Sequence, residues 1–280
     1  MLIPKEGKIM SRLMTVFLLI MFSLAIQTCS FAPPKAEIEK KSMEIGLYEE
    51  WLMGLIALRN IKIPLYNPSG NLKPLEIKFR TIIKKLHFHA SDLDFWRETY
   101  KSPEVVILRS RSENAFTLPG GFVCLTTGLI RRVYKNAKNG DLAMVGILAH
   151  ELVHLYREHP KRHYVSMLLK DNVARQYRQM AEGIQAAAGD FTSDYTKLII
   201  KTILKAKEAG TEGYQATMEF EADVMGVEVM IKAGYNPKGL IDALGVMKHH
   251  MGGIHGSYED RVSRVKKAIK KLKKKHRKRK

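Results

Sequence analysis

The chain has 280 residues, of which 45% are hydrophobic, enough for a folded core in one large domain. Its formal net charge is +19, but residues 266–280 carry eleven Lys and Arg and no acid, so much of the excess lies in the C-terminal tail. The two cysteines, Cys29 and Cys124, exclude a disulfide scaffold and a zinc ribbon, so any bound metal would take His and carboxylate ligands.

The N-terminus has the pattern of an export signal. Basic residues precede an apolar run from Leu13 to Ile26, which is typical of a signal-peptide core and short for a membrane span. Cys29 follows this run, where a lipoprotein signal places its lipidated cysteine. Lipidation, ordinary cleavage and an uncleaved anchor are three alternatives, and each exports the rest of the chain. We therefore expect residues 1–32 to be a signal or anchor and the protein to be periplasmic and membrane-associated.

Beyond the signal, the sequence predicts a mostly helical α+β domain over residues 33–272, with one small sheet. The β-branched segment 104–110 predicts a strand, and two short apolar runs around Pro119-Gly120-Gly121 predict a hairpin. Asp141 follows Asn139-Gly140 and is the predicted cap of the next helix. The predicted helices cover residues 36–59, 75–87, 128–136, 141–158, 161–188, 192–208, 213–233, 237–250 and 257–275.

The segment LAHELVHLYREH, residues 148–159, places two histidines four apart with a glutamate between them. On a helix, His150 and His154 share one face, where two imidazoles one turn apart can bind one zinc ion. Glu151 can then accept a proton from the attacking water. A core helix with its polar residues exposed is the simpler interpretation, but apolar neighbours surround all three polar residues. The motif therefore predicts a zinc site.

A catalytic zinc needs a third protein ligand and an open position. His159 lies about 140° round the helix from His154, so we expect it to face away from the metal, as a structural or outer residue. In the segment MEFEAD, Glu219 and Asp223 are four apart and share a face. Glu219 can bind zinc while Asp223 accepts a hydrogen bond from a ligand histidine. Glu221 lies about 200° away, on the other side of that helix. Such an acidic pair is often only a solvated face, and the motif upstream favours the metal site.

Four segments together resemble a known family of zinc metallopeptidases. They are ENAFTLPGGFVCLTTGLI, LAHELVHLYREH, MEFEADVMGVEVMIKAGYNP and IHGSYEDRV, and they lie between residues 113 and 262 in the family's order and approximate spacing. The family includes the CAAX prenyl proteases, the HtpX heat-shock membrane proteases, the periplasmic β-barrel assembly-enhancing proteases and a mitochondrial inner-membrane stress protease. The export signal makes the chain most similar to the soluble periplasmic members.

The resemblance implies a zincin-type fold in which the edge strand of a small sheet flanks the active-site helix, with one Zn²⁺ per chain. His150, His154 and Glu219 would bind the zinc. Glu151 would be the general base, and Asp223 would orient a ligand histidine.

The resemblance also implies a substrate-binding edge strand in GGFVCLTT, where an extended backbone would pair with residues Gly121, Phe122, Val123 and Cys124. Cys124 itself is interpreted as a small hydrophobic residue without a ligand role. His255 matches a loop histidine of the periplasmic members that approaches the zinc and has a catalytic or switching role there, although Gly256 replaces the family's proline. Arg261 would fix that loop through an ion pair or hold the substrate.

The C-terminal segment combines a helix with a basic tail, residues 273–280. Apolar residues recur at helical spacing, so we expect one face of the helix to dock on the domain through Val262, Val265, Ile269 and Leu272. The tail is either solvated or attracted to anionic lipid headgroups. Nucleic-acid binding conflicts with export.

Two functions are consistent with these patterns. The first is a zinc endopeptidase of the cell envelope that hydrolyses misfolded or envelope polypeptides. The second is a chaperone-like envelope protein that keeps the fold with little catalysis. The complete set of ligands and base favours the enzyme, because a scaffold has no use for Glu151.

Overall fold

The computed structural model describes residues 35–61, 63–65, 72–91, 93, 103–163, 165–166, 216–248 and 256–277. Apart from residues 35–37, these belong to one compact unit, formed by Ile38–Leu168 and Thr211–Lys280. The predicted signal over residues 1–32, most of the helices predicted over 161–208, and His255 lie outside the described ranges. Within those ranges, no helix is both long enough and apolar enough to cross a membrane.

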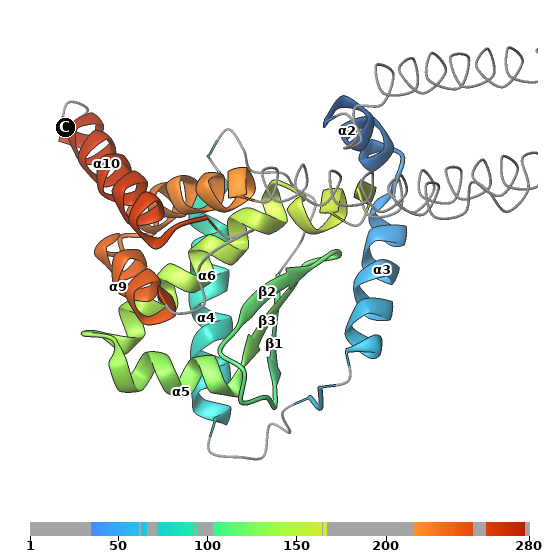
Figure 1. Ribbon diagram of the computed structural model, residues 1–280, viewed down its shortest axis with the longest axis horizontal. Coiled ribbons are helices and arrows are strands. Elements are labelled where there is room, and N and C mark those ends of the chain that lie inside the picture. The colour runs from blue at the N-terminus through green and yellow to red at the C-terminus, as the bar shows by residue number, and fades with distance from the viewer. Residues whose placement is uncertain are drawn as a thin grey trace, which may run out of the picture. The chain divides into compact units, whose positions relative to one another are not determined.

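Three strands form one mixed sheet in the order β1–β3–β2 (Figure 1). β1 (Glu104–Leu108) pairs in parallel with β3 (Phe122–Thr126), and β2 (Ala115–Leu118) pairs antiparallel with the other side of β3. The predicted hairpin is therefore present between β2 and β3. Gly120 and Gly121 supply its turn with φ angles of 79° and 95°, which other residues rarely adopt.

The prediction that GGFVCLTT forms the edge strand is wrong. β3 is the central strand, and its residues are buried along the whole length. Because β1 and β2 occupy both sides of β3, a substrate backbone cannot pair with Gly121, Phe122, Val123 or Cys124. The outer strands of the sheet are β1 and β2, and β2 is the one that precedes the turn.

The helices agree with the predicted ranges, with shifted ends. They are α2 (Lys35–Met43), α3 (Leu47–Asn60), α4 (Lys73–Ala90), α5 (Thr127–Asn136), α6 (Gly140–Tyr156), α9 (Lys238–Met247) and α10 (Tyr258–Arg277), with further helical residues over 159–163, 165–166 and 216–232. The helix predicted over 36–59 is interrupted at residues 44–46. The cap of α6 is Asn139, whose side-chain oxygen accepts the Leu142 N–H at 3.0 Å, and the prediction of Asp141 as the cap is wrong. Asp141 lies instead in the first turn and contacts Lys78.

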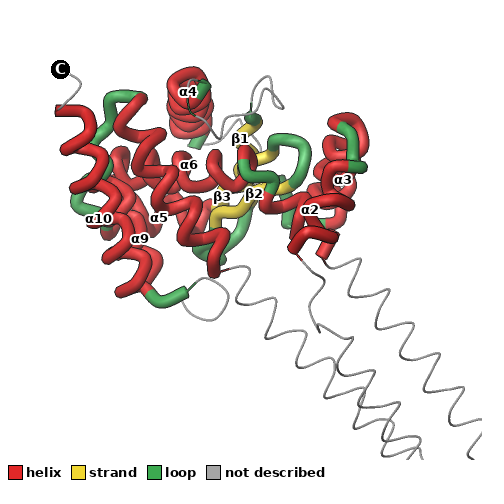
Figure 2. Tube along the Cα trace, turned by 90° about the horizontal axis from the view of Figure 1, so that it is seen from above, coloured by secondary structure: helices red, strands yellow, loops and turns green. Residues whose placement is uncertain are grey.

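The helix that carries the two motif histidines, α6, lies at the centre of the core and is buried over most of its length (Figure 2). It contacts α4, α5, α9 and strand β2. Two glycines permit the close crossing of α6 and α9. A Cβ atom on Gly146 would lie 2.7 Å from the Leu240 backbone, and one on Gly239 would lie 2.2 Å from the Leu142 carbonyl oxygen. This crossing fixes α6 against α9.

The helix α10 docks on the domain as predicted. Its apolar stripe, Val262, Val265 and Ile269, is buried, and Leu272 packs against the same core. The mostly helical α+β architecture expected from the sequence is confirmed. Docking of α10 also brings its first turn to the helix over 216–232, which matters for the site.

Candidate metal centre

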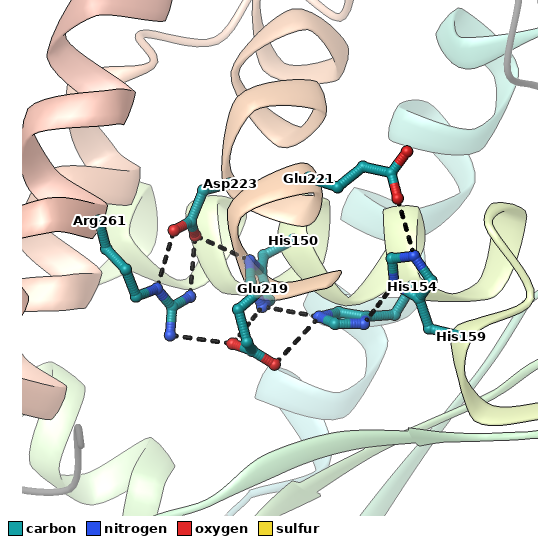
Figure 3. A network of polar contacts seen from close by, with 7 residues as sticks. All are labelled: His150, His154, His159, Glu219, Glu221, Asp223 and Arg261. Carbon is teal, nitrogen blue, oxygen red and sulfur yellow. Dashed lines mark hydrogen bonds and ion pairs between the residues drawn. The ribbon is translucent and has the colours of Figure 1, made fainter. Parts of the chain in front are cut away.

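His150 and His154 project from one face of α6 toward Glu219 on the helix over 216–232 (Figure 3). The two Nε2 atoms lie 3.0 Å apart, and each is 3.5 Å from an oxygen of the Glu219 carboxylate. One ligand atom from each residue lies within 4.8 Å of the others. Ligand atoms 2.0–2.1 Å from a tetrahedral zinc ion would be about 3.4 Å apart, so the observed separations fit one such ion.

The hydrogen-bond roles of the histidines also fit a cation. His150 Nδ1 lies 3.0 Å from Asp223 Oδ1, and this carboxylate favours a proton on Nδ1. The Nε2 lone pair of His150 then points at the same place as His154 Nε2 and the Glu219 carboxylate. Three acceptors that converge in a buried place need a positive charge between them.

The surroundings of the two ligand histidines shift their pKa values in opposite directions. Although burial lowers it, the hydrogen bonds to Asp223 and Glu219 raise the pKa of His150 to about 10. Burial and the charge on His150 hold the pKa of His154 well below its usual value. The two histidines therefore differ, because the acidic partners of His150 favour its charged form and His154 is held neutral.

The partner of His150 is itself held by an arginine. Asp223 is fully buried, and Arg261 donates two hydrogen bonds of 2.8 Å to its carboxylate. Against the effect of burial, the hydrogen bonds from Arg261 and His150 keep the pKa of Asp223 below its usual value. Arg261 Nη1 also lies 2.9 Å from Glu219 Oε2. One guanidinium therefore orients both a ligand carboxylate and the carboxylate behind a ligand histidine.

Arg261 comes from the first turn of α10. Ser257 caps that turn, because its Oγ accepts the Asp260 N–H at 3.1 Å and donates to the Asp260 carboxylate at 2.7 Å. The preceding residue, Gly256, has a φ angle of 71°. Proline cannot adopt this angle, whereas glycine adopts it without strain.

His159 is an outer residue that contacts a ligand histidine, as predicted, but the expected direction of its side chain, away from the metal, is wrong. α6 ends at Tyr156, and Glu158 adopts a φ angle of 54°, so the helical spacing no longer applies beyond it. The chain turns back, and His159 Nδ1 lies 2.9 Å from His154 Nδ1. If His154 binds metal through Nε2, its Nδ1–H donates to His159.

On its other side, His159 contacts the carboxylate of Glu221, which was not among the predicted site residues. Its Nε2 lies 3.0 Å from Glu221 Oε2, and Arg157 Nη2 lies 2.7 Å from Glu221 Oε1. Burial opposes ionisation of Glu221, but hydrogen bonds from His159 and Arg157 lower its pKa to about 2. Each ligand histidine is thus backed by a carboxylate and an arginine. The basic residues that end the motif segment, Arg157 and His159, are the sequence signal for this second pair.

The candidate ligands open onto a cleft of about 250 Å³. Glu151, 7% exposed, lies in its wall beside the two histidines. The opposite walls come from β2, with Ala115, Phe116 and Thr117, and from α9, with Leu240, Leu244 and Met247. Arg261 reaches the cleft as predicted in sequence, whereas residues 121–124 do not line it.

Cys124 is fully buried in β3. Burial and the neighbouring Glu151 charge raise the pKa of its thiol to about 12. A thiol that stays protonated is a poor metal ligand, in agreement with its interpretation as a small hydrophobic residue.

A family model described as Peptidase family M48 matches residues 77–269, which include every described residue of the candidate site. The chain belongs to peptidase family M48. Membership confirms the predicted family resemblance and shows that the protein is a metallopeptidase. A Vibrio cholerae protein named "Putative beta-barrel assembly-enhancing protease" is 26% identical to this M48 peptidase over 144 residues. The match covers 46% of this chain and 25% of the Vibrio protein, so the chain spans about a quarter of that relative's length.

Proposed function

We propose that this M48 peptidase is a zinc-dependent endopeptidase, with one Zn²⁺ held by His150, His154 and Glu219. The observation that carries the proposal is the convergence of three ligand atoms within 4.8 Å, with separations that suit one tetrahedral ion. Two imidazoles and one carboxylate leave a fourth position for water or substrate, as catalytic zinc sites do.

Bound zinc would supply a Lewis acid that lowers the pKa of water toward ~7 and polarises a carbonyl group. Glu151, in the wall of the cleft, accepts a proton from the attacking water and then transfers it to the leaving amine. Asp223 and His159 keep the imidazoles of His150 and His154 in the orientation that directs Nε2 into the site. Arg261 fixes the Glu219 carboxylate.

Strand β2 is the element best suited to bind a polypeptide. It lines the cleft, and among the described strands it pairs only with β3, on one side. The backbone on its other side can pair with an extended peptide, which holds the scissile bond beside the ligands regardless of side-chain sequence. This favours unfolded or misfolded polypeptides as substrates, because a folded protein does not offer a free strand.

We place this activity in the cell envelope, as quality control of exported polypeptides. Two observations support this: the signal-like N-terminal run with Cys29, as a lipidation site or beside an anchor, and the similarity to the Vibrio protein named as a beta-barrel assembly-enhancing protease. The basic tail, residues 273–280, adds attraction to an anionic membrane surface of ~1 kcal/mol per basic residue close to it. Polypeptides and this surface are the proposed partners.

A casein digest tests the proposal, with the purified protein compared to Glu151→Gln. Loss of the general base should lower the rate by about 10²- to 10⁴-fold while zinc stays bound, because Glu151 is not a proposed ligand. Glu259→Gln, on an exposed side chain of α10, is the matched control and should cleave like the wild type. Chelation should abolish cleavage and added Zn²⁺ should restore it. Full activity of a zinc-loaded Glu151→Gln protein would contradict the mechanism, and absence of cleavage by the zinc-loaded wild type would favour the chaperone-like alternative.

A further inference from the structure

A second hollow, of about 350 Å³, adjoins the cleft at the start of β2. It is lined by Arg111, Glu113, Gly128, Arg131, Arg132, Lys135 and Asn136, and we name it the basic pocket. These residues come from the segment that precedes β2 and from the helix α5, two elements whose places in the fold can be followed in Figure 1. Glu113 lines both the basic pocket and the cleft, so the two hollows meet at this residue.

The charges of the basic pocket are unbalanced. Four of its residues are cations and one is an acid, which gives 4 − 1 = +3. Arg132 is already paired, because its Nε and Nη1 atoms lie 3.1 and 3.3 Å from the Glu113 carboxylate. The excess positive charge therefore rests on Arg111, Arg131 and Lys135, all of which are exposed.

The placement of these cations costs stability unless an anion joins them. Arg131 and Lys135 are four residues apart on α5, where like charges repel each other across one helical turn. Arg111 approaches the same hollow from a different segment. A carboxylate suits this set, since a guanidinium group binds its two oxygens with two parallel hydrogen bonds.

The neighbouring strand shows which carboxylate can arrive there. A peptide that pairs with β2 along the cleft and continues beyond Asn114 reaches the basic pocket. We propose that the basic pocket binds a carboxylate of the polypeptide substrate, from an Asp or Glu side chain or from the chain's C-terminus. The peptidase would then prefer substrates with a negative charge at a fixed distance from the scissile bond. This inference rests on the proposed function, because it assumes pairing of the substrate with β2.

The test uses peptides blocked at both ends that carry Asp, Asn or Lys at each position in turn around one scissile bond. The wild type should cleave the best Asp peptide with about fivefold higher kcat/KM than its Asn counterpart, as expected for exposed ion pairs worth ~1 kcal/mol together. High salt should reduce this ratio. The Asn peptide with a free C-terminal carboxylate forms a separate arm. If only the peptide with the free C-terminus is preferred over its blocked form, the pocket binds the C-terminal carboxylate of the chain. If only the blocked Asp peptides are preferred over their Asn counterparts, the pocket binds side-chain carboxylates.

The charge-reversed variant Arg131→Glu/Lys135→Glu should invert the preference and favour the Lys peptide, a gain that a misfolded protein cannot produce. Lys266→Glu/Lys270→Glu makes the same change of charge on exposed residues of α10 and should keep the wild-type ratio. Equal cleavage of Asp, Asn and Lys peptides in both end forms, or an Asp preference unchanged in the variant, would overturn the inference while the protease function stands.

Binding separates this inference from the proposed function. In fluorescence anisotropy, the Glu151→Gln protein should bind a labelled Asp peptide more tightly than the matching Asn peptide. In the charge-reversed variant, the order of these two affinities should be reversed. If the wild type cleaves no peptide, the proposed function fails, and this difference in affinity still decides whether the basic pocket binds a carboxylate. Equal affinities in that experiment would refute it.

Discussion

Arg261 is the residue whose removal should cost this domain most among the polar side chains of the site. It is 4% exposed, and its guanidinium contacts the fully buried Asp223 twice and Glu219 once. Arg261→Met keeps much of the side-chain volume but leaves the Asp223 carboxylate buried, with His150 as its one remaining partner among the described residues. Breaking a buried ion pair from one side costs about 3–5 kcal/mol, because the remaining charge loses its compensation. For a domain of this size, ~3 kcal/mol lowers Tm by about 6–12 °C.

Urea unfolding of the metal-free protein measures this cost without a contribution from bound zinc. Lys267→Met, on an exposed position of the same helix, is the control and should change the free energy of unfolding by less than about 0.5 kcal/mol. The double variant Arg261→Met/Asp223→Asn should lose less than the two single losses added together, since each side chain is the other's main partner. A loss below about 1 kcal/mol for Arg261→Met, or strictly additive losses, would show that Arg261 does not hold Asp223 in the way described.

Three further predictions concern the surroundings of the site. His159→Leu removes the partner of His154 Nδ1 and should weaken zinc binding by about 10- to 100-fold in a competition titration. The far-UV circular dichroism should change little. An unchanged zinc affinity would show that His159 does not orient His154. Gly226→Ala should be tolerated, because its Cβ would lie 3.4 Å from the backbone nitrogen of His150, an ordinary contact distance. The larger side chain of Gly226→Leu should separate the two ligand helices and abolish zinc binding. Equal zinc content in the two variants would contradict this close approach. The hydrogen bond from Lys78 lowers the pKa of Asp141, so the stability that Asp141 contributes is present above its unfolded pKa of ~3.9 and is lost as pH falls through the folded value. Asp141→Asn should thus cost ~0.2–1 kcal/mol in urea unfolding at pH 7 and less at pH 3, and an equal cost at both would refute the assignment.

The part of the site that follows from local helical geometry could be predicted from the sequence. His150 and His154 share a face of one continuous helix, and Glu219 and Asp223 share a face of another. In both pairs the spacing of four residues fixes the relative direction of the side chains. Spacing does not show that the two helices meet. That expectation came from the need of a catalytic zinc for a third ligand, and the family resemblance implied it as well.

The errors arose where position depends on distant parts of the chain or on one backbone angle. Strand order is one case: β3 is central only because β1, which precedes the hairpin by several residues, pairs in parallel with it. His159 is another, because the positive φ of Glu158 redirects the chain after α6. Glu221 escaped notice for the same reason, since its partner His159 was expected elsewhere.

The central claim is that His150, His154 and Glu219 hold one zinc ion. The zinc content of the purified protein, measured by mass spectrometry after identical dialysis of the wild type, Glu219→Ala and Glu151→Gln, tests this most directly. We predict one zinc per chain in the wild type and in Glu151→Gln, and nearly none in Glu219→Ala. Equal zinc content in Glu219→Ala and the wild type, or no zinc in the wild type after loading with Zn²⁺, would contradict the account.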